Sequence, residues 1–412
     1  MTDWDIVVVG AGAAGLMAAI RASQLRRRVL VLEKNRKAGV KILMSGGTRC
    51  NLTHATDNRG IVESFGPPGR FLHSALAAFS VQDTLEWFAS AGVATKVEET
   101  GKIFPVSNKA LDVLDALLRR LQDSGAQLSL EEPLLDLQPC SPGFALTTPG
   151  RVLSAAKVIL TTGGQSYPGC GTTGDGYTLT SRLGHTIVSP RPALVPLKVA
   201  VPWIAELRGI TLPDAAVRIV EDGKTLVSRR GSLLFAHFGL SGPVILDISR
   251  IVSGHARPET LIVEMDLSPT LAESALDEFL RVETAAAGKK QLVALLPEHL
   301  PRRLREAILS AAGLPRERKA AALSRGDRLR LVAAIKNLRL PIAGTLGFAK
   351  AEVTAGGVAL DEVDSRTLRS KRVPGLYLAG ELLDLDGPIG GYNFQAAWST
   401  GWLAGQRAVQ DD

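Results

Sequence analysis

The stretch DIVVVGAGAAG, residues 5–15, decides the fold of the first part of this chain. Its apolar run is typical of a buried parallel strand, and Gly10, Gly12 and Gly15 follow at once with the spacing GxGxxG. An Ala-rich segment typical of a helix comes next, and a second apolar run, residues 29–32, ends on Glu33. The sequence therefore predicts a β-α-β unit within about 30 residues.

Such a unit has a defined chemistry. The glycines let the backbone turn tightly and approach a pyrophosphate at the amino terminus of the helix. A carboxylate at the end of the second strand can hold the ribose hydroxyls of an adenosine and repels a 2′-phosphate. We therefore predict a dinucleotide site. The residues assigned to it are Gly10, Gly12, Ala13, Ala14, Gly15, Glu33 and Lys34.

The last part of the chain predicts that this dinucleotide is FAD. A strand ending on Gly380 and Glu381 precedes a Gly-rich turn, residues 387–393, and a helix from Gln395. This order resembles the second FAD motif of the glutathione-reductase-like flavoproteins. The resemblance implies that Glu381 meets the ribityl or pyrophosphate region, and that the helix amino terminus near Asn393 faces the flavin pyrimidine ring. Residues 161–164, TTGG, resemble a strand-end motif of the same superfamily.

A family resemblance extends over nearly the whole chain. Five segments, in order, are similar to the BaiN-like flavoproteins, also called the aminoacetone-oxidase family of FAD enzymes: residues 39–53, 174–177, 237–243, 353–358 and 390–393. Thr48 stands where the commoner pattern has glycine, and His54 stands where it has asparagine. The resemblance implies an FAD-dependent oxidoreductase.

The loop of residues 45–53 suits a flavin cradle. Its glycines permit close backbone approach, its polar side chains can hydrogen-bond phosphate or ring edges, and a nearby lysine can offset anionic charge. The further cofactor contacts that we expect are Lys41, Ser45, Gly46, Gly47, Cys50, Asn51, Thr53, Leu134, Thr162, Gly163, Gly164, Gly380, Glu381, Gly390, Gly391, Tyr392, Asn393 and Gln395.

The candidate catalytic residues are His237, Tyr392 and Cys50. Reduction of a conjugated alkene needs a hydride from the flavin and a proton from a poised acid. His237 lies in a Gly/Ser-rich motif and is the best proton donor by sequence, with Tyr392 and Tyr167 as rivals. For His237 we give more weight to a buried structural role, and for Cys50 to a small packed thiol.

The pattern along the chain predicts an α/β class. Helical patterns cover residues 74–91 and 110–124, and Gly125 is expected just past the second helix. Residues 191–266 alternate with period two around an Asp222-Gly223 hairpin signal, and residues 270–340 are helical in pattern. We expect a discontinuous, glutathione-reductase-like Rossmann domain with an inserted β subdomain and then a helical subdomain. The expected segments are 1–190, 191–268, 269–342 and 343–412.

A second GxGxxG pattern, residues 169–174, follows Tyr167 and Pro168 rather than a strand. We predict a loop before a helix over residues 175–183, because the β-α-β context is missing. No separate NAD(P) domain is therefore expected. NADH or NADPH is a candidate diffusible electron donor.

The composition indicates a globular protein, with 45% hydrophobic and 22% charged residues. No targeting segment and no run of about 20 apolar residues is visible, so we expect no membrane association. Cys50, Cys140 and Cys170 form no CxxC pattern. We expect neither disulfides nor a metal site, and a cytoplasmic location.

Residues 299–340 are strongly basic, with eleven Lys and Arg opposed locally by Glu306, Glu317 and Asp327. This segment is a candidate RNA-binding or anion-binding face, and we favour a solvated helical face instead. The leading hypothesis is therefore hydride transfer through flavin N5 to or from a small or medium organic substrate: NAD(P)H-driven reduction of a conjugated C=C, or alternatively amine oxidation. An RNA-modifying flavoprotein and a non-enzymatic flavin sensor are the hypotheses from other classes. The oligomeric state stays open.

Overall fold

The chain forms two compact units in the computed structural model, which describes residues 2–410. The first unit combines Met1–Arg191 with Glu352–Asp412, and the second unit is Pro192–Ala351. The first unit contains a mainly parallel sheet with helices. The predicted α/β class and the discontinuous Rossmann-type domain with an insertion are therefore confirmed. The boundaries of the four predicted segments stay a prediction.

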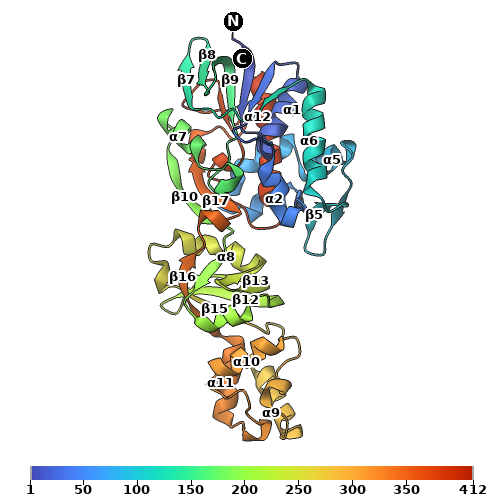
Figure 1. Ribbon diagram of the computed structural model, residues 1–412, viewed down its shortest axis with the longest axis vertical. Helices are drawn as coiled ribbons and strands as arrows, with labels where there is room; N and C mark the ends of the chain where they lie inside the picture. The colour runs from blue at the N-terminus through green and yellow to red at the C-terminus, as the bar shows by residue number, and fades with distance from the viewer. Residues whose placement is uncertain (1, 411–412) are drawn as a thin grey trace. The chain divides into compact units, whose positions relative to one another are not determined.

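The central sheet of the first unit has the strand order β6-β2-β1-β9-β8-β7, and β18 pairs with the second half of β9 (Figure 1). Val8 pairs with Val31 on one side and with Ile159 on the other, and all three are fully buried. The parallel strands are β1 (Trp4–Val9), β2 (Val29–Leu32), β6 (Gln127–Ser129), β9 (Val152–Leu160) and β18 (Leu376–Leu378). The antiparallel strands are β7 (Asp136–Cys140) and β8 (Gly143–Thr147).

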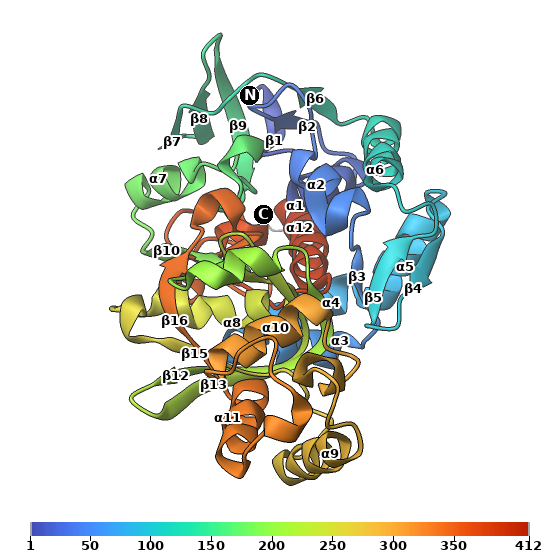
Figure 2. The same cartoon turned by 60° about the horizontal axis from the view of Figure 1, so that its bottom comes forward.

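Two helices from opposite ends of the sequence, α1 (Ala13–Gln24) and α12 (Tyr392–Gln410), lie side by side (Figures 1 and 2). A Cβ on Gly401 would come within 2.2 Å of the Ala14 carbonyl oxygen, and one on Gly405 within 2.3 Å of the Ala18 carbonyl oxygen. Glycine at these two positions lets the backbones of the helices touch. This contact holds the first glycine turn and the last Gly-rich turn in one unit.

The other helices of the first unit match the predictions in part. The helical pattern over residues 74–91 is confirmed except for a break at Phe79 and Ser80, because Ser80 caps a new helix by a capping box with Asp83 and the segment is two helices. The helix over residues 110–124 is confirmed, and Gly125 follows with φ +84°. The helices are α2 (Val40–Thr48), α3 (Asn58–Ser64), α4 (His73–Ala78), α5 (Val81–Ser90), α6 (Ala110–Ser124) and α7 (Asp175–Arg182).

Two small sheets complete the first unit. One has the order β3-β5-β4 and the other pairs β10 with β17. The strands are β3 (Thr53–His54), β4 (Thr95–Val97), β5 (Lys102–Pro105), β10 (Ile187–Ala193) and β17 (Val353–Val358). The second GxGxxG pattern forms a loop before α7, as predicted. Helix α12 begins at Tyr392, three residues before the predicted start.

The second unit contains a closed barrel with the strand order β11-β14-β13-β12-β15-β16. The predicted hairpin is confirmed, because Asp222 and Gly223 turn between β12 and β13 with φ of +47° and +79°. The strands are β11 (Leu197–Val199), β12 (Thr211–Glu221), β13 (Lys224–Ala236), β14 (Gly239–Ser241), β15 (Ile262–Asp266) and β16 (Leu338–Thr345). Helix α8 (Pro243–Gly254), which the β pattern did not predict, buries Ile245 and Ile248 in the core of this unit.

Three further helices of the second unit, α9 (Glu273–Ala286), α10 (Arg302–Ala311) and α11 (Arg325–Lys336), lie together (Figure 2). They confirm the helical pattern after residue 270, except that residues 338–340 belong to β16. Leu276, Leu304 and Leu331 turn inward from the three helices and are fully buried. Within residues 2–410, no helix is both long enough and apolar enough to cross a membrane.

Candidate functional site

The first glycine turn leaves the amino terminus of α1 open. Gly10 has φ +100°, and a Cβ there would lie 2.7 Å from the Thr161 carbonyl oxygen. Gly12 precedes the helix without a side-chain cap, and a Cβ on Gly12 would meet no described atom within 4 Å. Unpaired amides and the helix dipole attract an anion at such a point. This geometry fits a pyrophosphate.

Glu33 lies at the end of β2 with its carboxylate fixed by the backbone. Its Oε2 accepts a hydrogen bond from the Ala11 amide at 2.8 Å, and its Oε1 accepts one from the Asn35 amide at 2.9 Å. Each carboxylate oxygen keeps a lone pair for a ribose hydroxyl. The neighbouring Lys34 forms an ion pair with Asp175, so its charge is neutralised within the chain.

An ion pair joins α2 to the segment that follows β18. Lys41 Nζ lies 2.5 Å from Glu381 Oε2 and 2.6 Å from Ser166 Oγ. The other carboxylate oxygen, Glu381 Oε1, accepts hydrogen bonds from the Ser166 hydroxyl at 2.8 Å and from the Thr354 amide at 2.9 Å. The structure therefore brings the expected residues Lys41 and Glu381 together. Sequence reasoning missed Ser166 and did not assign Thr354, although Thr354 lies in one of the family-like segments.

The Ser45–Thr53 loop contains left-handed backbone at Gly46 and Gly47, with φ of +56° and +66°. The space beside Gly47 is open, whereas the Ser45 hydroxyl donates to the Ile42 carbonyl at 2.8 Å. Asn51 is 8% exposed, and its buried Oδ1 has no hydrogen-bond partner among residues 2–410. This unpaired acceptor is available to a donor on a ligand.

A second buried oxygen in the predicted cofactor region, Thr162 Oγ1, also has no partner among the described residues. Leaving a buried polar atom unpaired costs about 1–3 kcal/mol, so bound ligand groups at these atoms would be stabilising. Together with the open turn at Gly12 and the fixed carboxylate of Glu33, these two atoms fit FAD. Gly164 packs on Thr354, with a would-be Cβ only 2.4 Å from its Oγ1.

The Gly-rich turn before α12 is closed by Asn393. Its Oδ1 accepts a hydrogen bond from the Gly387 amide at 2.8 Å, and its Nδ2 donates to the Gly387 carbonyl at 2.9 Å. Gly391 packs on Thr53, since a Cβ on Gly391 would lie 2.5 Å from the Thr53 carbonyl. The turn therefore lies directly against the Ser45–Thr53 loop.

Two residues expected to contact the cofactor have their side chains committed elsewhere. The Gln395 side chain is fully buried; it accepts from the Thr53 hydroxyl at 2.7 Å and donates to Thr84 Oγ1 at 2.9 Å. The side chains of Thr53 and Gln395 are both fully buried. Their hydrogen bond therefore anchors the Ser45–Thr53 loop to helix α12 and leaves neither side chain facing an open site. Leu134 is half-buried and packs against the core of the first unit.

Cys50 is fully buried, and burial raises the pKa of its thiol to about 12. The thiolate is the reactive form of cysteine, so this environment favours the packed thiol over a catalytic one. Cys50, Cys140 and Cys170 are free thiols. Among residues 2–410, no group of three or more His, Cys, Asp or Glu side chains could hold a metal ion.

His237 is exposed in the turn between β13 and β14, and its ring contacts Phe238 edge-on. The expectation of a buried structural histidine is therefore wrong, because a two-residue turn leaves this side chain on the surface. His237 belongs to the second unit, whereas every expected cofactor contact belongs to the first. Tyr392 and Tyr167, its rivals as proton donor, are half-buried residues of the first unit.

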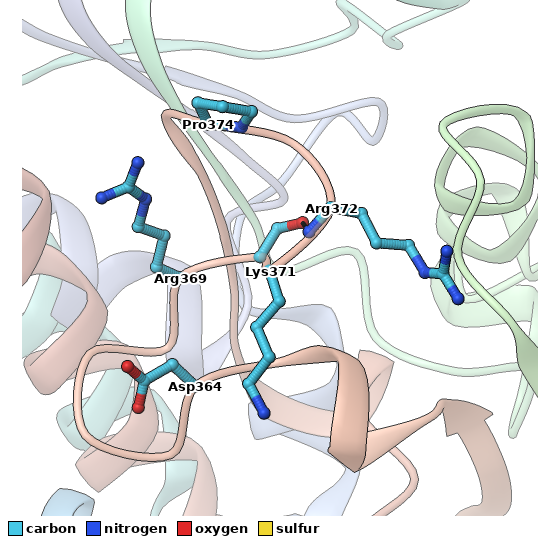
Figure 3. A pocket seen from close by; sticks show the side chains of 6 residues that line it. Asp364, Arg369, Lys371, Arg372 and Pro374 are labelled. Carbon is cyan, nitrogen blue, oxygen red and sulfur yellow. Dashed lines mark hydrogen bonds between the residues drawn. The ribbon is translucent and has the colours of Figure 1, made fainter.

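A pocket of about 330 Å³ lies at the other end of β18, before the strand begins. Its lining is basic, but Arg369 and Arg372 extend to opposite sides of the loop (Figure 3). Arg372 pairs with Glu362, and Lys371 Nζ donates to the Asp361 carbonyl at 2.8 Å. Because Glu381 follows the carboxyl end of β18, this pocket is separate from the candidate site. The lining residues are Asp364, Arg369, Ser370, Lys371, Arg372 and Pro374.

The basic segment of residues 299–340 is partly neutralised by ion pairs inside the second unit. Several of its cations pair with acidic residues from other parts of the chain, which a count along the segment misses. The structure therefore favours a structural role for the segment, and RNA binding through it stays a prediction. The closest pairs with acidic residues outside the segment are Arg328–Asp277 at 2.6 Å, Lys336–Asp266 at 2.7 Å and Arg339–Glu264 at 3.4 Å. Within the segment, the closest pairs are Arg302–Glu306 at 3.0 Å, Arg318–Asp327 at 2.6 Å and Arg330–Asp327 at 2.5 Å.

Comparison with known proteins places this geometry in a family. The family described as "HI0933-like protein Rossmann domain" matches residues 4–407. The chain is 34% identical over 412 residues to the ribosomal RNA dihydrouridine synthase of Escherichia coli, covering 99% of each protein. It is 33% identical over 408 residues to the 3-dehydro-bile acid delta(4,6)-reductase of Clostridium scindens, covering 98% of this chain and 99% of the relative.

Solved structures share the fold at low sequence identity. The 3-ketosteroid-delta4-(5alpha)-dehydrogenase of Rhodococcus jostii superposes with a TM-score of 0.50 at 16% identity, covering 99% of this chain and 98% of the other. The FrdA chain of Escherichia coli quinol fumarate reductase gives the same TM-score and identity, with 99% and 70% covered. These similarities support the arrangement of a Rossmann-type domain with an insertion.

Proposed function

The chain belongs to the HI0933-like family of Rossmann-domain flavoproteins and is an oxidoreductase, and from this premise we propose that it uses FAD to reduce a C=C bond conjugated to a carbonyl group. The electron donor in this proposal is a diffusible NADH or NADPH. The acceptor is a small or medium organic molecule, and a uracil base of RNA is the second candidate.

One observation carries the proposal. Two relatives that align with almost the whole chain are named for different substrates, a bile acid and ribosomal RNA. The names describe the same chemical change, because a dihydrouridine is a uridine whose conjugated pyrimidine C=C is saturated, and a delta(4,6)-reductase acts on C=C bonds. We infer that this chain shares that type of reaction, whatever the acceptor.

Four features of the first unit would hold FAD. The open amide terminus at Gly12 would bind the pyrophosphate, and Glu33 would bind the ribose. Lys41 would place a positive charge beside the cofactor, held in position by Glu381, and Asn51 Oδ1 would accept a hydrogen bond. Bound FAD supplies the hydride through N5.

The RNA acceptor is kept as the second candidate because of the relative that is 34% identical. The ion pairs that cations of residues 299–340 form, among them those with Asp277 and Asp266, remove part of the charge that would have supported it. Amine oxidation, the alternative from the sequence, has no support from the two relatives, both of which are named for products or reactions of reduction.

The test is an anaerobic reduction followed by an acceptor panel. The FAD-loaded protein is mixed with NADH and, separately, with NADPH while the absorbance of oxidised flavin is followed. We expect one of them to bleach the flavin, and a ketosteroid with a conjugated C=C or a transcribed ribosomal RNA fragment to restore the absorbance without oxygen. Bleaching by amines alone, with peroxide formed in air, would contradict the proposal.

A further inference from the structure

His54 and Tyr392 form a packed group with Gly390 at the start of α12. The imidazole of His54 stacks on the phenol ring of Tyr392, with the ring centroids 4.6 Å apart and the planes 21° apart. His54 Nδ1 lies 3.1 Å from the Gly390 carbonyl oxygen. A Cβ on Gly390 would lie 3.1 Å from Tyr392 Cε2 and 3.2 Å from His54 Nδ1, so only glycine leaves both rings undisturbed.

The backbone fixes the imidazole on two edges. A carbonyl oxygen only accepts hydrogen bonds, so His54 Nδ1 must carry the hydrogen. At the opposite edge, a Cβ on Gly101 would lie 2.6 Å from His54 Nε2, so the Gly101 backbone covers this nitrogen closely. The imidazole is therefore placed to hold the ring of Tyr392, and its Nδ1 is committed to the Gly390 carbonyl.

The hydroxyls of Tyr392 and Tyr167 have no hydrogen-bond partner among residues 2–410, whereas those of Tyr177 and Tyr377 each lie 3.4 Å from a backbone carbonyl oxygen. Tyr377 is 1% exposed, with its hydroxyl 3.4 Å from the Arg407 carbonyl oxygen. The pKa of Tyr177 is raised mainly by burial, and the pKa of Tyr167 is raised by burial and by Glu352. Tyr392 is half-buried, and its hydroxyl makes no hydrogen bond to any other residue of 2–410. Its hydroxyl is thus available to a bound molecule.

Tyr392 also lies beside the candidate cofactor loop. It follows Gly391, which packs on the Thr53 carbonyl, and it opens α12, whose first amides have no partner within the helix. The positive end of a helix dipole stabilises a nearby negative charge, such as a phenolate. A proton leaving the Tyr392 hydroxyl would therefore leave its charge in a favourable place.

We propose that Tyr392 donates the proton in the reduction and that His54 is its positioning residue; this rests on the proposed function. The hydride and its electron pair add to the β-carbon of the acceptor. The π electron pair shifts toward the carbonyl, the O–H bond of Tyr392 breaks, and the proton adds to the α-carbon. The phenolate then takes a proton from water. His54 fixes the plane of the phenol ring and does not touch the acceptor.

The first test distinguishes a loss of proton donation from a loss of FAD binding or flavin reduction. In the holoenzyme, Tyr392→Phe keeps the stacked ring but removes the proton. We expect reoxidation of the reduced flavin by the acceptor to fall about 10²–10⁴-fold. The visible spectrum, the Kd for FAD and the rate of flavin bleaching by NAD(P)H should stay within about twofold. Full reoxidation in Tyr392→Phe, or a comparable loss in Tyr167→Phe instead, overturns the assignment.

The second test addresses His54 without relying on turnover. His54→Phe keeps a flat ring on Tyr392, whereas His54→Asn keeps a donor for Gly390 and removes the stack. His73→Asn is the matched control, since His73 is an exposed histidine of α4. In holoenzyme labelled with 13C-tyrosine, we expect the Tyr392 ring resonances to move in His54→Asn and to stay near their places in the other two variants. Unmoved resonances in His54→Asn overturn the positioning role.

The two proposals can fail separately. If the wild type reduces no unsaturated acceptor, the proposed function and the proton transfer from Tyr392 are both wrong, and the resonances still decide whether His54 holds Tyr392. If the wild type reduces an acceptor and Tyr392→Phe does so equally well, only the proton assignment is wrong. A loss in His54→Asn that His54→Phe rescues, seen in reoxidation but not in flavin bleaching, supports the positioning role.

Discussion

Lys41 and Glu381 lie 340 positions apart in the sequence, and their side chains meet at 2.5 Å. The two side chains are 28% and 19% exposed. Their ion pair joins helix α2 to the segment after β18. Ser166 bridges both members of the pair. This contact connects the two sequence motifs that the cofactor would have to bind at once.

We expect Lys41→Met to weaken FAD binding about 10- to 100-fold. The variant leaves the carboxylate of Glu381 without its cation, and because the pair is partly exposed, the loss in unfolding free energy should be only about 1–2 kcal/mol. Fluorescence titration of apoprotein with FAD measures the first effect and urea unfolding the second. Arg59→Gln, which removes an exposed helix pair with Glu63, is the control. Equal FAD affinity in Lys41→Met and the wild type would show that the pair is not part of the cofactor site.

The glycine turn allows a sharper separation of binding from folding. A Cβ on Gly12 has open space around it, so Gly12→Ala should leave the thermal unfolding of the apoprotein nearly unchanged and weaken FAD binding tenfold or more. Gly10→Ala should destabilise the apoprotein by about 1–3 kcal/mol, because φ is +100° and the Cβ would strike the Thr161 carbonyl. For both variants, calorimetry measures the stability of the apoprotein and titration with FAD measures the affinity. Undiminished FAD binding by Gly12→Ala would mean that the pyrophosphate lies elsewhere.

Acid should destabilise the first unit through Glu362. Arg372 above all, and then Thr186, hold the pKa of Glu362 at about 2 against the effect of burial. A carboxyl group whose pKa is lowered by folding stabilises the native state above its unfolded value near 4.5. That contribution, on the order of 3 kcal/mol, is lost as the pH falls from 4.5 to 2.

The matching experiment compares the wild type with Glu362→Gln in urea unfolding from pH 7 to pH 2.5. We expect the wild type to be more stable at pH 7 and the difference to shrink below pH 4.5. The pKa of His185 is lowered mainly by burial, so its protonation adds to the loss of stability as the pH falls below about 6.5 in both proteins. A difference that stays constant down to pH 2.5 would show that Glu362 is not the group responsible.

Cys140 and Cys50 should differ in reactivity. Cys140 is exposed, whereas Cys50 is fully buried with a pKa raised to about 12. At pH 8 we expect iodoacetamide to alkylate Cys140 within minutes and to leave Cys50 unmodified in the native protein, by at least a 100-fold difference in rate. Peptide mass spectrometry with and without denaturant measures both. Rapid modification of native Cys50 would restore it as a candidate redox thiol.

Local patterns predicted much of this fold. The β-α-β unit, the helix ending at Gly125 and the Asp222-Gly223 hairpin each depend on residues within a few positions of one another. In each case a glycine, or a short run or repeat of apolar residues, sets the backbone conformation. Helix α8 was missed because the alternation on either side of it favoured strands, and Ser80 was not recognised as a cap.

Long-range partners could not be predicted in the same way. The sequence indicated Lys41 and Glu381 separately, but not that Ser166 and Thr354 complete their hydrogen bonds. Likewise, Asp277 and Asp266 neutralise cations that lie far from them in the chain, so the charge of the basic segment was overestimated. The exposure of His237 depends on how β13 and β14 pair, which the composition of its motif does not indicate.

The central claim is that reduced flavin in this protein transfers a hydride to a C=C bond conjugated to a carbonyl. Its most direct test is an anaerobic titration of the reduced holoenzyme with an unsaturated acceptor, followed by mass spectrometry of the product. The account predicts that one equivalent of acceptor reoxidises one equivalent of flavin and that the product is two mass units heavier. Flavin that stays reduced with both conjugated ketosteroids and ribosomal RNA, but is reoxidised by oxygen after reduction by an amine, would contradict it.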